Sequence, residues 1–187
     1  EQRAASALET LTAAIEASQR IMQNLRPTIL EQGLVAALQW MSARFERRTG
    51  VACELRTHLD AADEPLQLPA GVPLVAYRTA QEALTNVSKH ARATKVVIDL
   101  SLSGSVLSLE IVDNGCGMTS ADLAKAQSFG IRGLRERAST VGGWIDLSSG
   151  SGGTSMILSV PLAEFVATEF DQGENADPGD DRTWTIY

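Results

Sequence analysis

The chain has few of the residues that define several specialised classes of protein. Its 187 residues include two cysteines, Cys53 and Cys116, which lie far apart and in no metal-ligand spacing. This usage excludes a disulfide framework and a cysteine-based zinc site, and we expect reduced thiols. No apolar run approaches the ~18 residues that cross a membrane, and no signal peptide opens the sequence. We therefore expect a cytoplasmic protein; any attachment of a longer parent protein to the inner membrane would lie in regions outside this sequence.

Positive charge is also scarce. The chain carries 16 lysine and arginine residues against 23 acids, which gives a formal net charge of -7. Residues 169–187 contain six acids and one base, so they contribute -5 and leave only -2 for residues 1–168. The main part of the chain is therefore nearly balanced and has no basic face, and we do not expect it to bind nucleic acid.

The two ends of the chain differ from its middle. Apolar residues recur at helical spacing near the N-terminus, at Leu8, Leu11, Ile15, Met22 and Leu25. We expect a helix over residues 1–26, which ends because a residue before proline is forced out of helical geometry. Its narrow apolar seam needs partner helices. Residues from about 165 onward are acidic and rich in turn formers, and we expect them to be disordered.

Between the ends, the apolar pattern switches between helical and strand periods. Helical spacing predicts helices over residues 34–49, 74–91 and 131–141. Alternation predicts a strand over residues 51–55 and hairpins over residues 95–112 and 144–160, the second with a turn at residues 149–153. The expected fold class is α+β, a two-layer sandwich whose antiparallel or mixed sheet of about five strands carries helices on one face.

The helix expected over residues 74–91 gathers polar groups away from its apolar stripe. Glu82, Asn86, Lys89 and His90 recur at spacings of three and four residues. An amide oxygen beside basic groups suits a hard cation that carries phosphates. For any single one of these residues, a solvated helix face is the alternative interpretation.

Glycines mark the other candidate sites. Asp113 follows a strand and precedes Gly115 and Gly117, which allow a ligand close to the backbone while the carboxylate accepts a hydrogen bond from an exocyclic amine. An ordinary turn is the alternative. Gly130 and Gly133 begin a helix, where free backbone N–H groups favour an anion. The last motif, which opens the final strand, is Gly152-Gly153-Thr154.

In this order, the four motifs resemble those of the histidine-kinase ATPase family, within the GHKL superfamily of Bergerat-fold proteins that includes gyrase and MutL. Residues 81–91, QEALTNVSKHA, are similar to the family's N box, and residues 113–118, DNGCGM, to its first glycine box. Residues 129–137 and 152–154 resemble its later glycine motifs. The amino-acid sequences of these motifs, and of residues 20–40, resemble those of the subfamily paired with NarL/LuxR-type response regulators. The resemblance covers about residues 5–162.

The resemblance implies that the chain binds ATP with Mg²⁺. It implies that Asn86 binds the Mg²⁺ bridging the phosphates and that Glu82 orients or activates near the reacting phosphoryl group. It also implies phosphate or ribose contacts for Lys89 and His90 and an adenine contact for Asp113. The remaining implied roles are closure of the loops and lid at Gly115, Gly117, Gly130 and Gly133, and support of the adenine pocket by Thr154.

The resemblance further implies a domain organisation. Residues 1–27 would be the second helix of an incomplete dimerisation and phosphoacceptor domain, residues 28–163 the ATP-binding catalytic domain, and residues 164–187 an acidic tail. The parent would be a homodimeric sensor kinase that relays a phosphoryl group through a histidine to a response regulator. This chain has only His58 and His90, and neither matches a helical acceptor site. We therefore expect no autophosphorylation by this chain alone.

One departure from the family pattern and two alternative functions remain at this point. Ser128 stands where the subfamily usually has a glycine, which affects how tightly the lid closes. An anti-sigma-type serine kinase would share the fold, but such kinases lack the dimerisation-helix segment. A non-catalytic dimerising scaffold with a vestigial nucleotide site would not need the full set of Glu82, Asn86 and Asp113.

Overall fold

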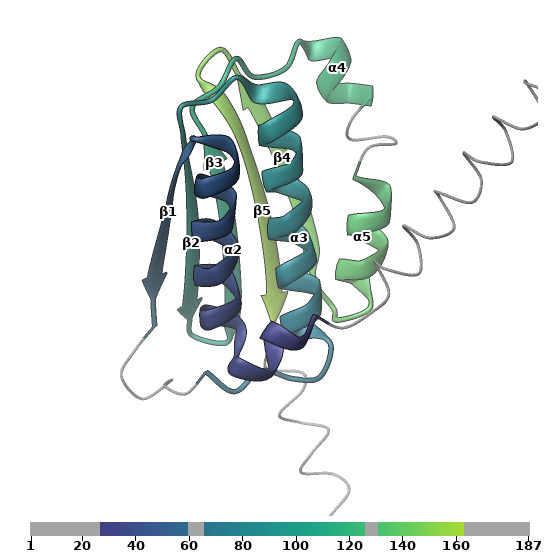
Figure 1. Ribbon diagram of the computed structural model, residues 1–187. Coiled ribbons are helices and arrows are strands. Elements are labelled where there is room, and N and C mark those ends of the chain that lie inside the picture. Colours follow the sequence, from purple (N-terminus) through teal and green to yellow (C-terminus); the bar gives the residue numbers. More distant parts are fainter. Residues whose placement is uncertain (1–26, 60–65, 126–130, 163–187) are drawn as a thin grey trace, which may run out of the picture.

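A computed structural model, shown in Figure 1, describes residues 27–59, 66–125 and 131–162. Its helical elements are η1 (Thr28–Gln32), α2 (Leu34–Thr49), α3 (Val72–Asn86), η3 (Val87–Ala91), α4 (Ser120–Lys125) and α5 (Arg132–Ser139). Its strands are β1 (Ala52–His58), β2 (Lys95–Ser103), β3 (Val106–Asp113), β4 (Trp144–Gly150) and β5 (Gly153–Pro161). The helix expected over residues 1–26 and the acidic tail lie outside the described residues.

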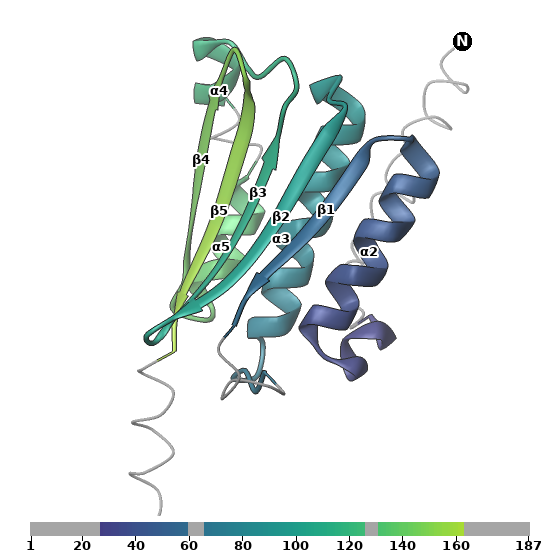
Figure 2. The ribbon, with the colours of Figure 1, turned by 90° about the vertical axis from the view of Figure 1, so that its left-hand side faces the viewer.

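The strands form one mixed sheet in the order β1-β2-β3-β5-β4. β1 pairs with β2 in parallel, and the other three pairings are antiparallel. Figure 2 shows α2, α3 and α5 together on one side of this sheet, which leaves the other face without helices among the described residues. The expected α+β two-layer sandwich is confirmed.

The core lies between the sheet and its helices because each strand turns alternate residues inward. Leu100, Leu109 and Leu158 are fully buried on neighbouring strands. They stand side by side, since Leu100 pairs with Leu109 and Leu109 with Leu158 in the sheet register. Leu38 of α2 and Val72 of α3 are equally buried on the helical side. This alternation is the pattern that predicts the hairpin over residues 95–112, which is also confirmed.

Several local features differ from the sequence-based expectation, including the short helix η1 and the extension of β1 to His58. The helix expected to run to residue 91 changes at Val87 into a single π-helical turn. α4 was not expected, although Thr119 and Asp122 form a side-chain cap at its start, in which the Asp122 N–H donates to the Thr119 hydroxyl. The β4–β5 turn is shorter than expected, because the strands stay paired up to Gly150 and Gly153. Within the described part of the chain, no helix is both long and apolar enough to cross a membrane.

Candidate functional site

A cavity of about 540 Å³ opens at one end of the sandwich. It lies where α3 and η3 face β3, β5 and the end of β4, with α4 and the start of α5 at its rim. Residues from every one of these segments line it: Glu82, Ala83, Asn86, Val87, His90, Ala91, Ile111, Asp113, Gly117, Met118, Asp122, Ile131, Leu147, Thr154 and Met156. The cavity therefore collects five of the residue positions expected from the sequence to touch a nucleotide or its metal, together with Gly117.

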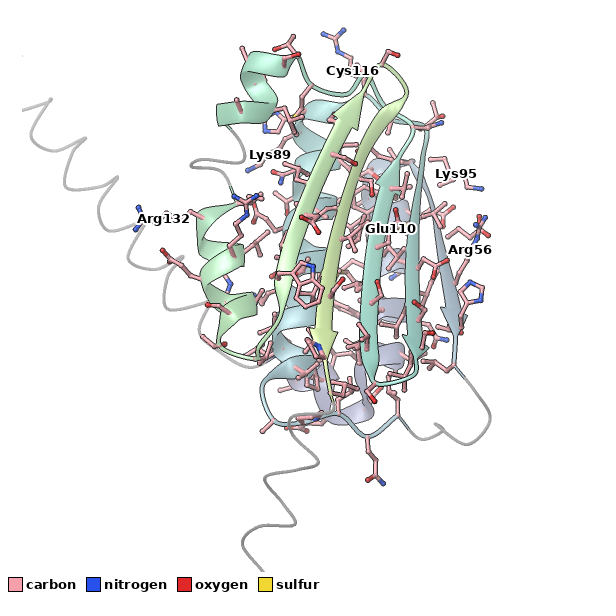
Figure 3. All side chains as sticks on the ribbon, turned by 180° about the vertical axis from the view of Figure 1, so that it is seen from behind. Arg56, Lys89, Lys95, Glu110, Cys116 and Arg132 are labelled. Atoms are coloured by element: carbon pink, nitrogen blue, oxygen red, sulfur yellow. The ribbon has the colours of Figure 1, made fainter. Side chains whose placement is uncertain are left out.

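The polar wall of the cavity comes from α3 and η3. Glu82, Asn86 and His90 follow one another at intervals of four residues and all line the cavity. The π-helical turn from Val87 to Ala91 is a local widening of the kind often found at functional sites. Lys89, which belongs to the same turn, is exposed and is not among the lining residues. Figure 3 shows Lys89 at the same end of the molecule as Cys116.

Asp113 is a buried carboxylate at the opposite wall, with only 5% of its surface exposed. Its Oδ1 accepts the backbone N–H of Gly115 at 2.8 Å. Within the described residues, Oδ2 accepts no hydrogen bond and remains available to a ligand. A buried carboxylate without a full set of donors is costly, so a cavity that ends on Asp113 favours a ligand that donates a hydrogen bond there.

The backbone after Asp113 is held directly against the end of the helical wall. The N–H of Cys116 donates to the carbonyl oxygen of Ala91 at 2.8 Å. A Cβ atom at Gly115 would overlap that same carbonyl group, and one at Gly117 would overlap the carbonyl of Gly150. Gly117 also has a φ of 65°, in the left-handed region that favours glycine. The expected glycine positions 115 and 117 thus allow the loop to fit between η3 and the β4–β5 turn.

Ser149 fastens this loop to the last strand and was not identified from the sequence. Its Oγ accepts the Met118 N–H at 2.9 Å, and it lies 2.9 Å from the Thr154 hydroxyl and 3.1 Å from the Gly153 carbonyl oxygen. Met118 and Thr154 both line the cavity. Ser149 therefore sets the distance between two walls of the site, a role that no local sequence pattern reveals.

Most of the remaining lining is apolar and shapes a slot beside Asp113, whereas Asp122 of α4 adds a carboxylate at the rim. The side chains of the slot come from β3, the loop after it, the start of α5 and strands β4 and β5: Ile111, Met118, Ile131, Leu147 and Met156. The inward alternation of the strands could have identified Leu147 and Met156 as site residues, but Met118 and Ile131 reach the slot only through the tertiary fold. An apolar slot ending on a carboxylate suits a flat ring with an amino group.

Of the other two predicted glycines, only Gly133 lies among the described residues. Gly133 lies inside α5 and not among the lining residues, and a Cβ there would make only an ordinary contact with Arg137. Gly130 falls outside the described residues, as does Ser128. The structure therefore brings together Glu82, Asn86, His90, Asp113, Gly117 and Thr154, with Gly115 directly behind them.

A metal ion in this cavity would need ligand atoms from a bound molecule as well as from the protein. Among the residues that the structure describes, no three or more histidine, cysteine, aspartate or glutamate side chains are grouped so that they could hold a metal ion by themselves. Asn86 and Glu82 nevertheless place an amide oxygen and a carboxylate on one wall, and hard cations such as Mg²⁺ prefer oxygen ligands. A cation here would take most of its ligands from phosphates and water.

The comparisons with known proteins identify the family. A family model described as "Histidine kinase-, DNA gyrase B-, and HSP90-like ATPase" matches residues 71–164, which include every lining residue of the cavity. The chain belongs to this ATPase family. Such domains bind ATP, so the cavity of this ATPase domain is its candidate nucleotide site.

Within the family, the chain is similar to several sensor histidine kinases. It is 31% identical over 157 residues to the sensor histidine kinase MctS of Rhizobium johnstonii, which covers 82% of this chain and 33% of the relative. It is 35% identical over 144 residues to the sensor histidine kinase LiaS of Bacillus subtilis, which covers 76% of this chain and 38% of the relative. The chain therefore spans only about a third of the length of these relatives.

The fold is also found in solved structures. The blue-light activated histidine kinase EL346 of Erythrobacter litoralis matches with a TM-score of 0.56 and 22% identity, over 87% of this chain and 51% of that one. Its histidine kinase domain matches with a TM-score of 0.55 over 70% of this chain and 62% of that one. These two likenesses establish the shared α+β architecture of this ATPase domain.

Proposed function

We propose that this chain contains the catalytic domain of a two-component sensor histidine kinase, which binds Mg-ATP and transfers the γ-phosphoryl group to a histidine of its dimerisation domain. The observation that carries the proposal is one cavity that joins an apolar slot ending on the buried Asp113 to a polar wall with Glu82 and Asn86. The named relatives MctS, LiaS and the oxygen sensor kinase NreB of Staphylococcus carnosus are sensor histidine kinases, which supports the same activity here.

Asp113 would recognise adenine. Its free Oδ2 can accept a hydrogen bond from the exocyclic amino group, while Oδ1 stays bonded to Gly115. Guanine presents a carbonyl oxygen at the matching ring position, and a carbonyl oxygen facing a buried carboxylate is repelled. Thr154 would support the pocket, and the apolar slot would hold the ring. This arrangement would select ATP over GTP.

The polar wall would handle the phosphates. Asn86 would hold the metal through its amide oxygen, and Glu82 would orient or activate near the reacting phosphoryl group. His90, and Lys89 if its exposed side chain turns inward, would contact phosphate or ribose. Mg²⁺, when bound, would neutralise part of the phosphate charge. Positioning and charge neutralisation are most of what phosphoryl transfer requires from a protein.

The parent protein would complete the reaction. The bond from the γ-phosphorus to the bridging oxygen breaks, a bond to the acceptor histidine nitrogen forms, and ADP leaves. We place residues 1–27 as the second helix of the dimerisation domain, residues 28–163 as the catalytic domain and residues 164–187 as an acidic tail. The acceptor histidine would lie on a helix outside this sequence, in a cytoplasmic homodimer region whose four-helix bundle passes the phosphoryl group to a NarL/LuxR-type response regulator.

A labelling experiment tests this function. The chain is incubated with γ-labelled ATP and Mg²⁺, alone and with the isolated dimerisation domain of a NarL/LuxR-paired kinase that carries an acceptor histidine. We expect label on the added domain and none on this chain. Asn86→Ala should lower the yield by about a hundred-fold, because the phosphates lose their positioned metal. Ser88→Ala, an exposed change on the next turn, is the matched control. Stable label on this chain itself would contradict the proposed location of the acceptor.

A further inference from the structure

A second cavity, of about 240 Å³, lies between α2 and α3 and shares no lining residue with the nucleotide site. Its floor is formed by buried side chains of both helices: Met41, Phe45, Tyr77 and Leu84. Its rim carries Trp40, which is 41% exposed, together with the polar residues Arg44, Arg48, Gln81 and Thr85. We call this set of nine residues the α2–α3 groove.

The charges of the α2–α3 groove are positive. Arg44 and Arg48 lie one helical turn apart on α2, and no carboxylate is among the lining residues. Arg44 sits 5.0 Å above the ring of Trp40. Across the described residues, neither Arg44 nor Arg48 forms an ion pair with a carboxylate. Two exposed guanidinium groups beside an exposed indole form a surface that suits an acidic segment with aromatic residues.

The open face of the sheet provides a contrast. There Arg56 and Lys95 both lie 2.8 Å from carboxylate oxygens of Glu54, and these two ion pairs hold the pKa of Glu54 down to about 2. Figure 3 shows Arg56 and Lys95 on this face of the sheet. Arg56 and Lys95 on the sheet face are therefore neutralised within the domain. Arg44 and Arg48 of the α2–α3 groove form no ion pair with the described residues.

This chain contains a segment of the matching chemistry. Residues 169–187 carry six acids and one base, and include the aromatic residues Phe170, Trp184 and Tyr187. They contribute -5 to a chain whose remainder is nearly balanced. An acidic segment covalently attached to the domain meets the groove at a high effective concentration, so weak ion pairs suffice to hold it there.

The length of the connection allows the contact. The described chain ends at Leu162, whose N–H donates to the carbonyl oxygen of Ser105 in the β2–β3 turn. That turn lies at the end of the sandwich where α2 and α3 begin (Figure 1). The 16 residues of α2 span about 24 Å, which about seven extended residues can cover. The acids from Asp171 onward can therefore reach Arg44 and Arg48.

We propose that the acidic C-terminal segment, residues 169–187, docks on the α2–α3 groove of its own chain, with its carboxylates on Arg44 and Arg48 and an aromatic side chain beside Trp40. The contact is independent of the nucleotide site and of the function proposed for it. It neutralises the groove at low ionic strength and weakens as salt screens the charges.

Site-specific photo-crosslinking in the full chain tests the contact. A benzophenone amino acid replaces Thr183, which leaves the acids and aromatic residues in place. We expect crosslinks within one chain to peptides containing residues 40–48 or 77–85, identified by mass spectrometry. Arg44→Glu with Arg48→Glu should lower their yield about ten-fold, because two exposed ion pairs are lost. Arg47→Glu, an exposed change on the same helix outside the groove, should not.

Charge reversal in the acidic segment tests whether the groove and the segment pair with each other. Asp180→Lys with Asp181→Lys should lower the yield in the otherwise unchanged chain and restore it when combined with the Arg44 and Arg48 reversals. About 1 M salt should reduce the yield, since the screening length falls to about 3 Å. Crosslinks to other surfaces, crosslinks only between two chains, or a yield unaffected by the Arg44 and Arg48 reversals would overturn the proposal. Melting curves of all variants check that each chain folds.

Discussion

At the scale of the residue, we propose that Asp113 determines which base the candidate site recognises. It is one of three polar or charged residues buried in the described part of the chain, and one of its oxygens is already bonded to Gly115. Its position follows from the local sequence. A strand of alternating apolar residues ends at Asp113, and the glycines after it allow the chain to turn. The local sequence alone therefore predicts Asp113 as a site residue.

Asp113→Asn should weaken ATP binding by about 10- to 100-fold. The amide can satisfy either the Gly115 N–H or the adenine amino group with its single oxygen, but its NH₂ then faces the other donor. Loss of a buried hydrogen bond to a charged group costs about 1.5–3 kcal/mol, which corresponds to that range. Calorimetry measures the affinity, and Asp146→Asn, an exposed aspartate of β4, is the control. Unchanged ATP affinity in Asp113→Asn would refute the adenine contact.

The two thiols should differ in reactivity. Burial, with a smaller effect from the charge of Glu46, raises the pKa of Cys53 to about 11, whereas Cys116 is exposed. At pH 8 only about a thousandth of Cys53 is thiolate, and the fraction rises as the pH approaches 11. We expect one fast-reacting thiol with a thiol-specific disulfide reagent at pH 8, and none in Cys116→Ser until the pH is raised. Two equally fast thiols would contradict this account.

At the scale of the element, α3 serves two surfaces at once. Glu82 and Asn86 face the nucleotide site, while Gln81 and Thr85, each one residue earlier, line the α2–α3 groove. Helical periodicity places such neighbours about 100° apart, so this division is readable from the sequence. The π-helical turn after Asn86 does not follow from this periodicity, and its last residue, Ala91, accepts a hydrogen bond from the distant Cys116. Likewise Ser149 gains its role only from a loop some thirty residues earlier in the chain.

Ser149→Ala should loosen the joint between that loop and the last strand. The Met118 N–H loses its acceptor and the Thr154 hydroxyl loses a partner. We expect a loss of about 1–3 kcal/mol in the free energy of unfolding and about ten-fold weaker ATP binding. Denaturant unfolding and calorimetry measure the two effects. Ser148→Ala, an exposed neighbour, should change neither quantity. If Ser149→Ala left both the free energy of unfolding and the ATP affinity unchanged, the hydrogen bonds of Ser149 would have no energetic importance.

At the scale of the whole molecule, one layer of helices over one mixed sheet leaves the nucleotide site at an end of the sandwich. The layers and the hairpins were predictable, since each hairpin pairs residues close in sequence. The parallel pairing of β1 with β2 and the position of β5 between β3 and β4 were not. Both depend on contacts between segments that are distant in the sequence. The same alternation of apolar residues would also allow other strand orders. The expected motifs nevertheless contribute several residues to one cavity: Glu82, Asn86, His90, Asp113, Gly117 and Thr154.

The most direct test of the central claim is a calorimetric titration of this chain with ATP and with GTP, each with Mg²⁺. We expect saturable binding of ATP at one site per chain, at least about a hundred-fold tighter than GTP, because adenine presents an amino group to Asp113 where guanine presents a carbonyl oxygen. No binding of ATP up to millimolar concentration, or equal affinity for both nucleotides, would contradict this claim.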